Sequence, residues 1–339
     1  MTSDIAASPS PEPVSPEPLM RMMGGLQVTA ILRAGVQLGI FDQIATGKDQ
    51  PGSIAAATGA DERGTRILLD ALAALGLLKR EDSYQLTPLA DTFLVTGRPG
   101  YLGGVVNITA ESWTWSAYPR LAEAVARGGT ILDRHAETPG HEFWEVFAPS
   151  STGMAAPAAQ VLAELIREWA DQREELEILD IACGSGLYGL TLAAQHPMAH
   201  ATLLDWANVL EHTKDNVERL GLRERTSFID GDVFEVALGG PYDLIVASQI
   251  FHHFSEQRCL ELLCRLAPAL KPGGRLVIHD FVSGRLPADD PAPYLFSVVM
   301  LVCQRRARPI HSIPTRGSCV RRDSHPQRFT RARECRAAF

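Results

Sequence analysis

Five polar positions at the ends of successive apolar segments could together bind and activate a charged organic molecule. They are Asp180, Asp205, Asp232, the stretch 248–253 with its two histidines, and Asp280. A single aspartate in such a place is more often a turn former than a functional group. Five such positions, together with one glycine-rich loop, favour a shared binding site.

The glycine-rich loop runs from Asp180 to Gly186. Because Gly184 and Gly186 have no side chains, a ligand can approach the backbone there, beside the N–H groups of the following helix. Asp205, 25 residues after Asp180, is suited to bind both hydroxyls of a ribose. Asp232 can accept a hydrogen bond from an adenine amino group, so the loop and these acids favour a ligand that contains a nucleoside.

Residues 184–189 also fit the GxGxxG pattern, so a dinucleotide-binding enzyme is an alternative interpretation. The carboxylate of Asp180 counts against it, because this charge repels a pyrophosphate but tolerates an ammonium or a sulfonium group. The GxGxxG match alone is weak evidence, and the acids favour a positively charged ligand.

The elements that must position these residues alternate between short apolar runs and helical segments. This alternation predicts an α/β domain, with a parallel sheet covered by helices on both faces. In such a sheet ligands bind beyond the carboxyl ends of the strands, where all five positions fall. The expected strands are 177–181, 201–204, 227–229, 243–247 and 275–278, and the expected helices are 187–196, 209–220 and 256–270.

The first half of the chain predicts a helix–turn–helix followed by a wing. Ser53 and Asp61 can each cap a helix, and Gly59 and Gly76 can end these two helices. The expected segments are an apolar helical stretch at 19–41, wing strands at 77–79 and 84–87, and helices rich in aromatic residues at 104–167.

Composition limits the class of protein. The 339 residues suffice for two domains, and 45% apolar residues exclude a chain that is disordered throughout. No apolar run could span a bilayer, no secretory signal is recognisable, and six cysteines form no CxxC pair, so we expect a cytoplasmic protein without a membrane partner. The net charge is −8, but residues 304–339 hold ten arginines and two acids, which leaves −16 on the remainder. An acidic body argues against nucleic acid as a partner.

Taken together, the motifs resemble those of class I S-adenosylmethionine-dependent methyltransferases. The matching segments are 179–186, Asp205, 231–234 and 270–274, with 250–256 similar to the segment that carries the catalytic histidine of small-molecule O-methyltransferases, and 34–42 and 84–89 similar to their winged-helix dimerisation domain. The resemblance covers residues 19–302. It implies a homodimer with a Rossmann-like methyltransferase domain, preceded by a winged-helix dimerisation domain that is all-helical apart from its wing.

The resemblance also implies roles for single residues, with S-adenosylmethionine as cofactor and a hydroxylated aromatic or polyketide-like small molecule as acceptor. His252 is the expected general base, and Asp280 is expected to orient it. The expected cofactor-binding residues are Asp180, Ala182, Gly184, Gly186, Asp205 at the ribose, Asp232 and Val233 at the adenine, and Ser248. Many relatives have glycine at the position of Ala182, and some have lysine at that of Ser248.

Other interpretations concern metal binding and chemistry. On an extended strand end, His252 and His253 would point to opposite sides, and no third ligand is suitably spaced, so we expect no metal site. We expect His279 to face away from Asp280 and to pack. N- or C-methylation, or a non-methylating relative, are alternatives within the fold. A DNA-binding regulator is a further alternative, but the helix expected at 64–75 has only Arg66 as a basic side chain.

From residue 304 onward the composition shifts abruptly towards Arg, Pro, Ser, His and Cys. We hypothesise that the reading frame shifts near Cys303 and that a strand pair which completes the sheet in relatives is lost, leaving the fifth strand with an exposed edge. The expected divisions are a disordered leader at 1–18, the dimerisation domain at 19–100, a helical linker and pocket roof at 101–170, the methyltransferase domain at 171–302 and an aberrant basic tail at 303–339.

Overall fold

The computed structural model describes residues 15–109, 112–134, 138, 140–282 and 286–304, and the backbone of 321–322 and 329–330. The chain divides into two compact units, Met1–Val95 and Thr96–Phe339. Most of the predicted leader and most of the predicted tail lie outside the described residues. The frame-shift hypothesis concerns the tail, so it also falls outside the described residues.

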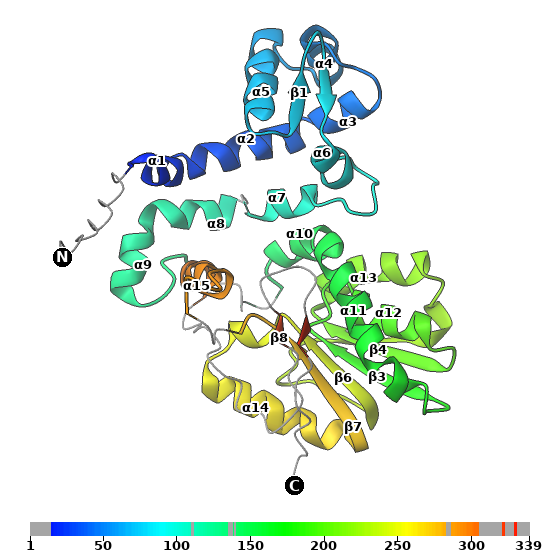
Figure 1. Ribbon diagram of the computed structural model, residues 1–339. Helices are drawn as coiled ribbons and strands as arrows, with labels where there is room; N and C mark the ends of the chain where they lie inside the picture. The colour runs from blue at the N-terminus through cyan, green and yellow to red at the C-terminus, as the bar shows by residue number, and fades with distance from the viewer. Residues whose placement is uncertain are drawn as a thin grey trace, which may run out of the picture. The chain divides into compact units, whose positions relative to one another are not determined.

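The first unit is a small helical domain with a two-stranded wing, labelled from α1 to α6 in Figure 1. The predicted wing is confirmed, because two short strands pair antiparallel with Lys79 opposite Gln85. The elements are α1 (Glu17–Met23), α2 (Gly25–Gln37), α3 (Ile40–Ala45), α4 (Pro51–Thr58), α5 (Glu62–Ala74), β1 (Leu78–Arg80), β2 (Tyr84–Leu86) and α6 (Pro88–Phe93).

The helix caps of this unit were predicted with mixed success. Asp61 caps α5 as expected, since its Oδ1 accepts a 2.8 Å hydrogen bond from the backbone N–H of Gly64. The prediction for Ser53 is wrong, because α4 begins at Pro51 and the Ser53 hydroxyl donates to the carbonyl of Gln50 at 2.8 Å. Proline fits the first turn of a helix, and the N-cap is Gln50, three residues upstream of Ser53.

The second unit is built on a five-stranded parallel sheet with the order β5-β4-β3-β6-β7, which confirms the predicted α/β architecture. Because β3 pairs with both β4 and β6, the strand order reverses between β3 and β6, the place where such sheets bind ligands. The strands are β3 (Leu176–Ile181), β4 (Ala199–Asp205), β5 (Thr226–Asp230), β6 (Tyr242–Ser248) and β7 (Leu270–His279).

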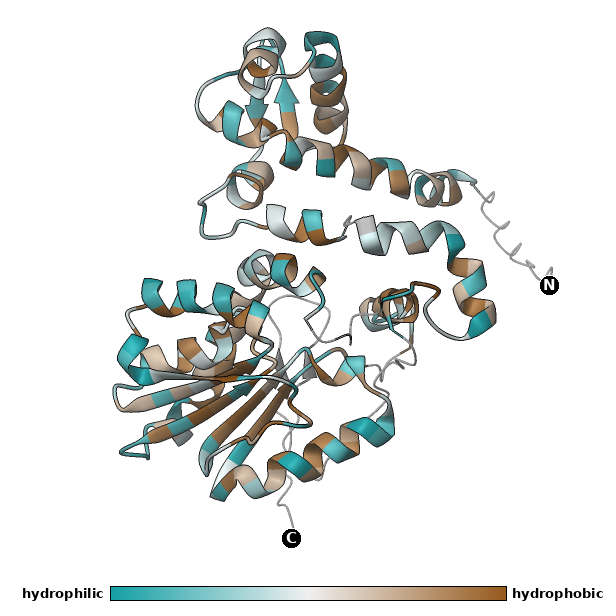
Figure 2. Ribbon diagram, turned by 180° about the vertical axis from the view of Figure 1, so that it is seen from behind, coloured by the Kyte–Doolittle hydropathy of each residue, from teal (hydrophilic) through white to brown (hydrophobic). Residues whose placement is uncertain are grey.

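Helices cover both faces of this sheet. In Figure 1, α11, α12 and α13 lie on one face and α14 on the other, and Figure 2 shows the central strands as mainly apolar. Each face has its own core, with Leu190 and Leu203 completely buried in one and Ile245 and Leu262 in the other. The helices around the sheet are α11 (Thr152–Ala170), α12 (Leu187–Gln195), α13 (Ala207–Arg219), η2 (Arg223–Arg225), α14 (Glu256–Leu266) and η4 (Ala267–Ala269).

Among the other helices of this unit, α10 packs against α7 and α13, and α15 packs against α8 and α9. The last of them, α15, buries Val302 and Cys303 against Ala117 and Ala124. Cys303 and Gln304 are therefore part of the packed unit, although composition assigned them to the tail. The remaining elements are α7 (Gly103–Thr109), α8 (Ser112–Ala117), η1 (Tyr118–Arg120), α9 (Leu121–Arg127), α10 (Phe143–Ser150), η3 (Phe251–His253), α15 (Ala292–Cys303) and the paired strands β8 (Arg321–Arg322) and β9 (Phe329–Thr330).

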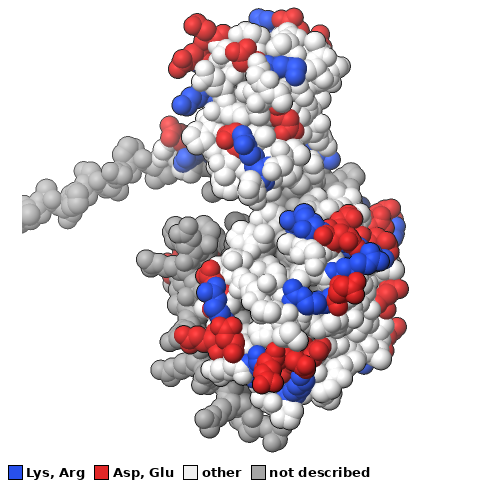
Figure 3. All heavy atoms as spheres, turned by 90° about the vertical axis from the view of Figure 1, so that its right-hand side faces the viewer, with Lys and Arg blue, Asp and Glu red and all other residues white. Residues whose placement is uncertain are grey.

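On the face shown in Figure 3, acidic and basic side chains are interspersed. In the described part of the chain, no helix is both long and apolar enough to cross a membrane.

Candidate active site

The carboxyl edge of the sheet brings the predicted polar positions together. Asp180 lies next to the last residue of β3, with Val246 of β6 opposite it, and Asp205 ends β4. Ser248 ends β6 opposite His279, the last residue of β7, and Asp280 follows directly. Asp232 comes two residues after β5 ends.

The loop after β3 has an unusual backbone. Ala182, Gly184 and Gly186 have φ angles of +48°, +55° and +74°, in a region that favours glycine. A Cβ atom on Gly184 would meet no other atom within 4 Å, so the space beside it is open. A Cβ on Gly186 would lie 2.6 Å from Cγ2 of Thr213, so helix α13 requires glycine there. The loop therefore offers bare backbone on one side and is tightly packed on the other.

Asp180 is completely buried beneath this loop. Its Oδ2 accepts a 2.8 Å hydrogen bond from the backbone N–H of Gly189 in α12, and its Oδ1 has no hydrogen-bond partner in the described part of the chain. Burial raises the pKa of Asp180 to about 8, opposed by the Gly189 N–H and assisted by the charge of Asp205. A cationic ligand nearby would relieve this cost of burying a carboxylate.

Asp205 joins the end of β4 to the glycine loop. Its Oδ2 accepts from the N–H of Gly184 and its Oδ1 from that of Trp206, both at 2.8 Å. Burial raises the pKa of Asp205 to about 6, against the effect of these two donors. Each carboxylate oxygen can accept a second hydrogen bond, so both remain available to a diol.

Asp232 and Val233 lie in the turn that follows β5. Oδ1 of Asp232 accepts a 2.8 Å hydrogen bond from the N–H of Phe234, which fixes the turn. The Val233 side chain is buried in the core on the α14 face. The turn lies next to Asp205, because the N–H of Gly231 donates to the Asp205 carbonyl at 3.0 Å.

His252 and Asp280 form a buried pair at the neighbouring strand ends. Nδ1 of His252 lies 2.6 Å from Oδ1 of Asp280, and the N–H of His252 donates to Oδ2 at 3.2 Å. The N–H of Phe281 also donates to Oδ1, at 2.7 Å. An aspartate that accepts from Nδ1–H leaves the Nε2 lone pair of the imidazole free to accept a proton.

The predicted orientation of the two adjacent histidines is wrong. Residues 251–253 form a turn of 3₁₀-helix instead of an extended strand end, so the rings of His252 and His253 lie side by side with centroids 4.2 Å apart. Nδ1 of His253 is 2.5 Å from Nε2 of Gln304. Burial, and then the proximity of His252, lowers the pKa of His253 well below its ordinary value. Among the described residues, no group of three or more His, Cys, Asp or Glu side chains could hold a metal ion.

His279 packs as predicted but also has a polar partner. Its Nδ1 lies 2.7 Å from the hydroxyl of Tyr188, which belongs to helix α12 directly after the glycine loop. This contact connects the helix that follows the glycine loop to the strand that leads into Asp280.

Aromatic rings surround the histidines, and sequence reasoning missed the nearest of them. Phe296 of α15 lies edge-on to His252 with ring centroids 4.9 Å apart, and Phe281 stacks on Phe296 at 4.1 Å. Trp144 of α10 meets His253 at 5.4 Å. Of the aromatic residues in the expected pocket roof, Phe143 contacts Trp144 at 5.0 Å. Phe296 gave no signal in the sequence, because a phenylalanine in an apolar helix predicts packing.

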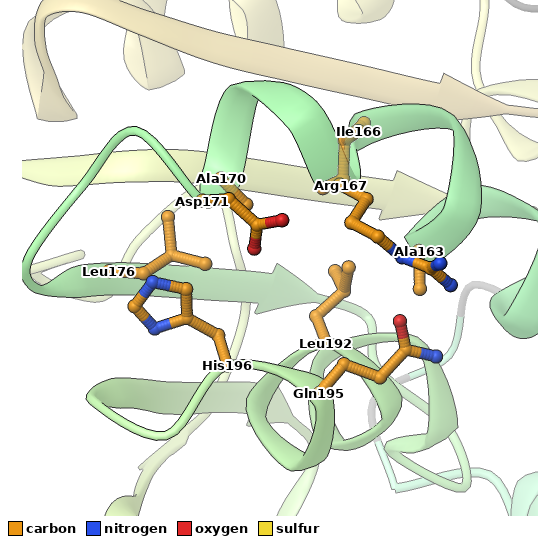
Figure 4. Close-up of a pocket in the computed structure, with 9 residues that line it drawn as sticks. All are labelled: Ala163, Ile166, Arg167, Ala170, Asp171, Leu176, Leu192, Gln195 and His196. Carbon is orange, nitrogen blue, oxygen red and sulfur yellow. The ribbon is translucent and has the colours of Figure 1, made fainter.

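A separate cavity of about 210 Å³ lies away from these residues, between the ends of α11 and α12 (Figure 4). It contains none of the predicted site residues. Its lining residues are Ala163, Ile166, Arg167, Ala170, Asp171, Leu176, Leu192, Gln195 and His196.

Comparison with protein families identifies both parts of the chain. Residues 141–315 match the O-methyltransferase domain, over more than half of the chain, and residues 20–96 match the O-methyltransferase dimerisation domain. The 3-hydroxy-5-methyl-1-naphthoate 3-O-methyltransferase of Streptomyces sahachiroi is 28% identical over 291 residues, covering 83% of this chain and 82% of that protein.

Solved structures agree. A Nostoc punctiforme protein described as an O-methyltransferase superimposes with a TM-score of 0.80 at 30% identity, covering 88% of this chain and 89% of that chain. Human N-acetylserotonin methyltransferase, solved in complex with S-adenosylmethionine, shares the fold with a TM-score of 0.66 at 23% identity, covering 88% of this chain and 89% of that one.

Proposed function

The chain belongs to the O-methyltransferase family and is an S-adenosylmethionine-dependent enzyme, and from this premise we propose how its own residues carry out the transfer. The observation that carries the proposal is the single sheet edge that holds buried carboxylates on one side and the His252–Asp280 pair on the other.

The residues of the glycine loop fit this cofactor. The unpartnered Oδ1 of Asp180 suits a cationic group, and the open space at Gly184 lets a ligand approach the backbone. A carboxylate in this position disfavours the pyrophosphate of a dinucleotide. We assign the methionine part to Asp180, Ala182, Gly184, Gly186 and Ser248. The ribose is assigned to Asp205, and the adenine to Asp232 and Val233.

His252 is proposed as the general base. When bound, the cofactor supplies a methyl group on a positively charged sulfur, which is already electrophilic, so the chain's main tasks are alignment and proton removal. A free imidazole has a pKa of about 6.5 and a phenol one of about 10, so removing the proton before attack would cost about 5 kcal/mol. Nε2 of His252 therefore accepts the proton as the oxygen attacks, and Asp280 stabilises the imidazolium that results.

The acceptor is proposed to be a hydroxylated aromatic or polyketide-like molecule. The aromatic rings of Phe296 and Trp144 beside the two histidines offer flat apolar contacts to such a ring system. The name of the Streptomyces sahachiroi relative, which methylates a hydroxynaphthoate, supports the same class.

One experiment tests the base and the cofactor site separately. His252→Gln should retain the affinity for S-adenosylmethionine, measured by calorimetry, while transfer of labelled methyl to a panel of phenols and naphthols falls by about 10²–10⁴-fold. His212→Gln, on the surface helix α13, is the matched control and should behave like the wild type. Undiminished turnover in His252→Gln would remove His252 from the role of base.

We further propose that the enzyme works as a homodimer in the cytoplasm. The match to a dimerisation domain supports the homodimer, as do apolar side chains of α1 and α2 that are more than 60% exposed: Leu19, Met20, Met22, Met23 and Leu26. Free thiols at Cys183, Cys259, Cys264 and Cys303 fit a reducing compartment. Sedimentation analysis should give twice the monomer mass, and a monomer at micromolar concentration would contradict the homodimer.

A further inference from the structure

The second imidazole of the site, His253, also has a polar partner and an aromatic neighbour. Its Nδ1 lies 2.5 Å from Nε2 of Gln304, and its ring is 4.2 Å from that of His252. Trp144 makes an edge contact with the ring of His253, with centroids 5.4 Å apart.

Gln304 is fixed independently of His253. It is completely buried at the end of α15, its N–H donates to the Met300 carbonyl at 2.9 Å, and its own carbonyl accepts from the N–H of Thr130 at 3.0 Å. Its side-chain Oε1 has no hydrogen-bond partner in the described part of the chain. A buried amide oxygen without a partner costs about 1–3 kcal/mol, so a packing role alone would favour leucine or methionine here.

The two imidazoles have opposite hydrogen-bonding character. A carboxylate faces Nδ1 of His252, so that nitrogen carries the hydrogen and Nε2 accepts. An amide N–H of Gln304 faces Nδ1 of His253, so this nitrogen accepts and Nε2 carries the hydrogen. Burial keeps the His253 ring uncharged, with a pKa well below its ordinary value, so it has one N–H to donate. Neither Nε2 has a hydrogen bond to any described residue.

We infer that His253, positioned by Gln304, is a specificity-determining residue that donates its Nε2–H to a second oxygen of the acceptor, next to the hydroxyl that is methylated. The inference rests on the proposed function, and it narrows the acceptor to aromatic hydroxyls with a neighbouring carbonyl or similar oxygen. In free ortho-hydroxy ketones, the carbonyl accepts a hydrogen bond from the hydroxyl itself. A donor that takes over the carbonyl oxygen releases the hydroxyl to Nε2 of His252.

The test compares two probe acceptors, 2-acetyl-1-naphthol and 1-naphthol, which differ in the neighbouring carbonyl. The wild type should have the higher kcat/KM for 2-acetyl-1-naphthol. His253→Phe, which keeps a ring against Trp144, and Gln304→Leu should each lower this preference by about tenfold, the equivalent of one uncharged hydrogen bond. His253→Gln, which restores an N–H donor, should recover part of the preference. Calorimetric binding of S-adenosylmethionine verifies that each variant is folded.

His200→Phe, which removes an imidazole from β4, is the control and should leave the preference unchanged. A preference that survives in folded His253→Phe overturns the inference while leaving the proposed function intact. Equal kcat/KM values for both probes in the wild type also overturn the inference and leave the proposed function intact. A wild type that binds the cofactor but methylates neither probe overturns the proposed aromatic acceptor, and the inference with it.

Discussion

Replacing Asp280 by asparagine tests the proposed base most directly, because the structure fixes what the change does. Asp280 accepts three hydrogen bonds, from Nδ1 and N–H of His252 and from the N–H of Phe281. Asparagine has one acceptor oxygen. If its oxygen replaces Oδ1, its amide group opposes the N–H of His252. If its amide group replaces Oδ1, Nδ1 of His252 must become an acceptor, and Nε2 then carries the hydrogen.

The expected size follows from these two orientations. In the first, a charge-assisted hydrogen bond becomes a neutral one and the imidazolium loses its counter-charge, a loss of about 1.5–3 kcal/mol or about 10- to 150-fold in kcat. In the second, the base has the wrong tautomer and the whole contribution of general-base catalysis, about 10²–10⁴-fold, is lost. We therefore expect kcat to fall by at least tenfold, with unchanged affinity for S-adenosylmethionine.

The assay measures methyl transfer from labelled cofactor at saturating acceptor, with calorimetry for cofactor binding and urea unfolding for stability. Asp215→Asn, an exposed aspartate on α13, is the matched control for loss of one carboxylate. If Asp280→Asn binds the cofactor, stays folded and retains kcat within threefold of the wild type, the assignment of Asp280 as the positioning partner of the base is refuted.

Three further predictions concern stability. Ala182→Gly should raise the free energy of unfolding by about 0.5–1 kcal/mol, because φ is +48° there, whereas Ala207→Gly in α13 should lower it; urea titration decides the sign. Asp180 binds a proton up to about pH 8 when folded but only to about pH 4 when unfolded, so stability should fall as pH rises through this window, by about 2 kcal/mol between pH 6 and 8. Asp180→Asn should remove that part of the slope, and an unchanged slope would contradict the raised pKa. Asp243→Ala should cost about 3 kcal/mol in thermal or urea unfolding, because Asp243 accepts from the Glu177 N–H and from Lys271 at 2.9 and 2.8 Å; a loss below 1 kcal/mol would show that these contacts contribute little.

The sheet and its polar edge could be predicted because they depend on patterns local in sequence. Apolar runs of strand length alternate with helical segments, and the topology of a parallel sheet sends every strand end to one edge. That rule is sufficient to predict that Asp180, Asp205 and Asp280 lie at the same edge of the sheet.

What the sequence could not predict depends on contacts between distant segments. His252 and His253 were expected on an extended strand end, where their side chains would point to opposite sides. Instead β6 ends at Ser248 and residues 251–253 form a 3₁₀-helix, so the two rings lie side by side. Gln304 is the first residue of the arginine-rich range 304–339. No local sequence pattern therefore linked it to His253, which lies 51 residues earlier in the chain. The positive φ of Ala182 could not be predicted either, since alanine does not favour this region.

The contact between Tyr188 and His279 reaches across the end of β6, from the helix that begins at the glycine loop to the strand that leads to Asp280, the proposed partner of the base. Methyl transfer demands that donor and proton acceptor keep a nearly constant separation, since small misalignments slow the reaction steeply. The hydrogen bond between Tyr188 and His279 links α12 to β7 and so opposes relative movement of these two elements, which would vary this separation. The enzyme thereby gains preorganisation from a tyrosine that need never touch either reactant.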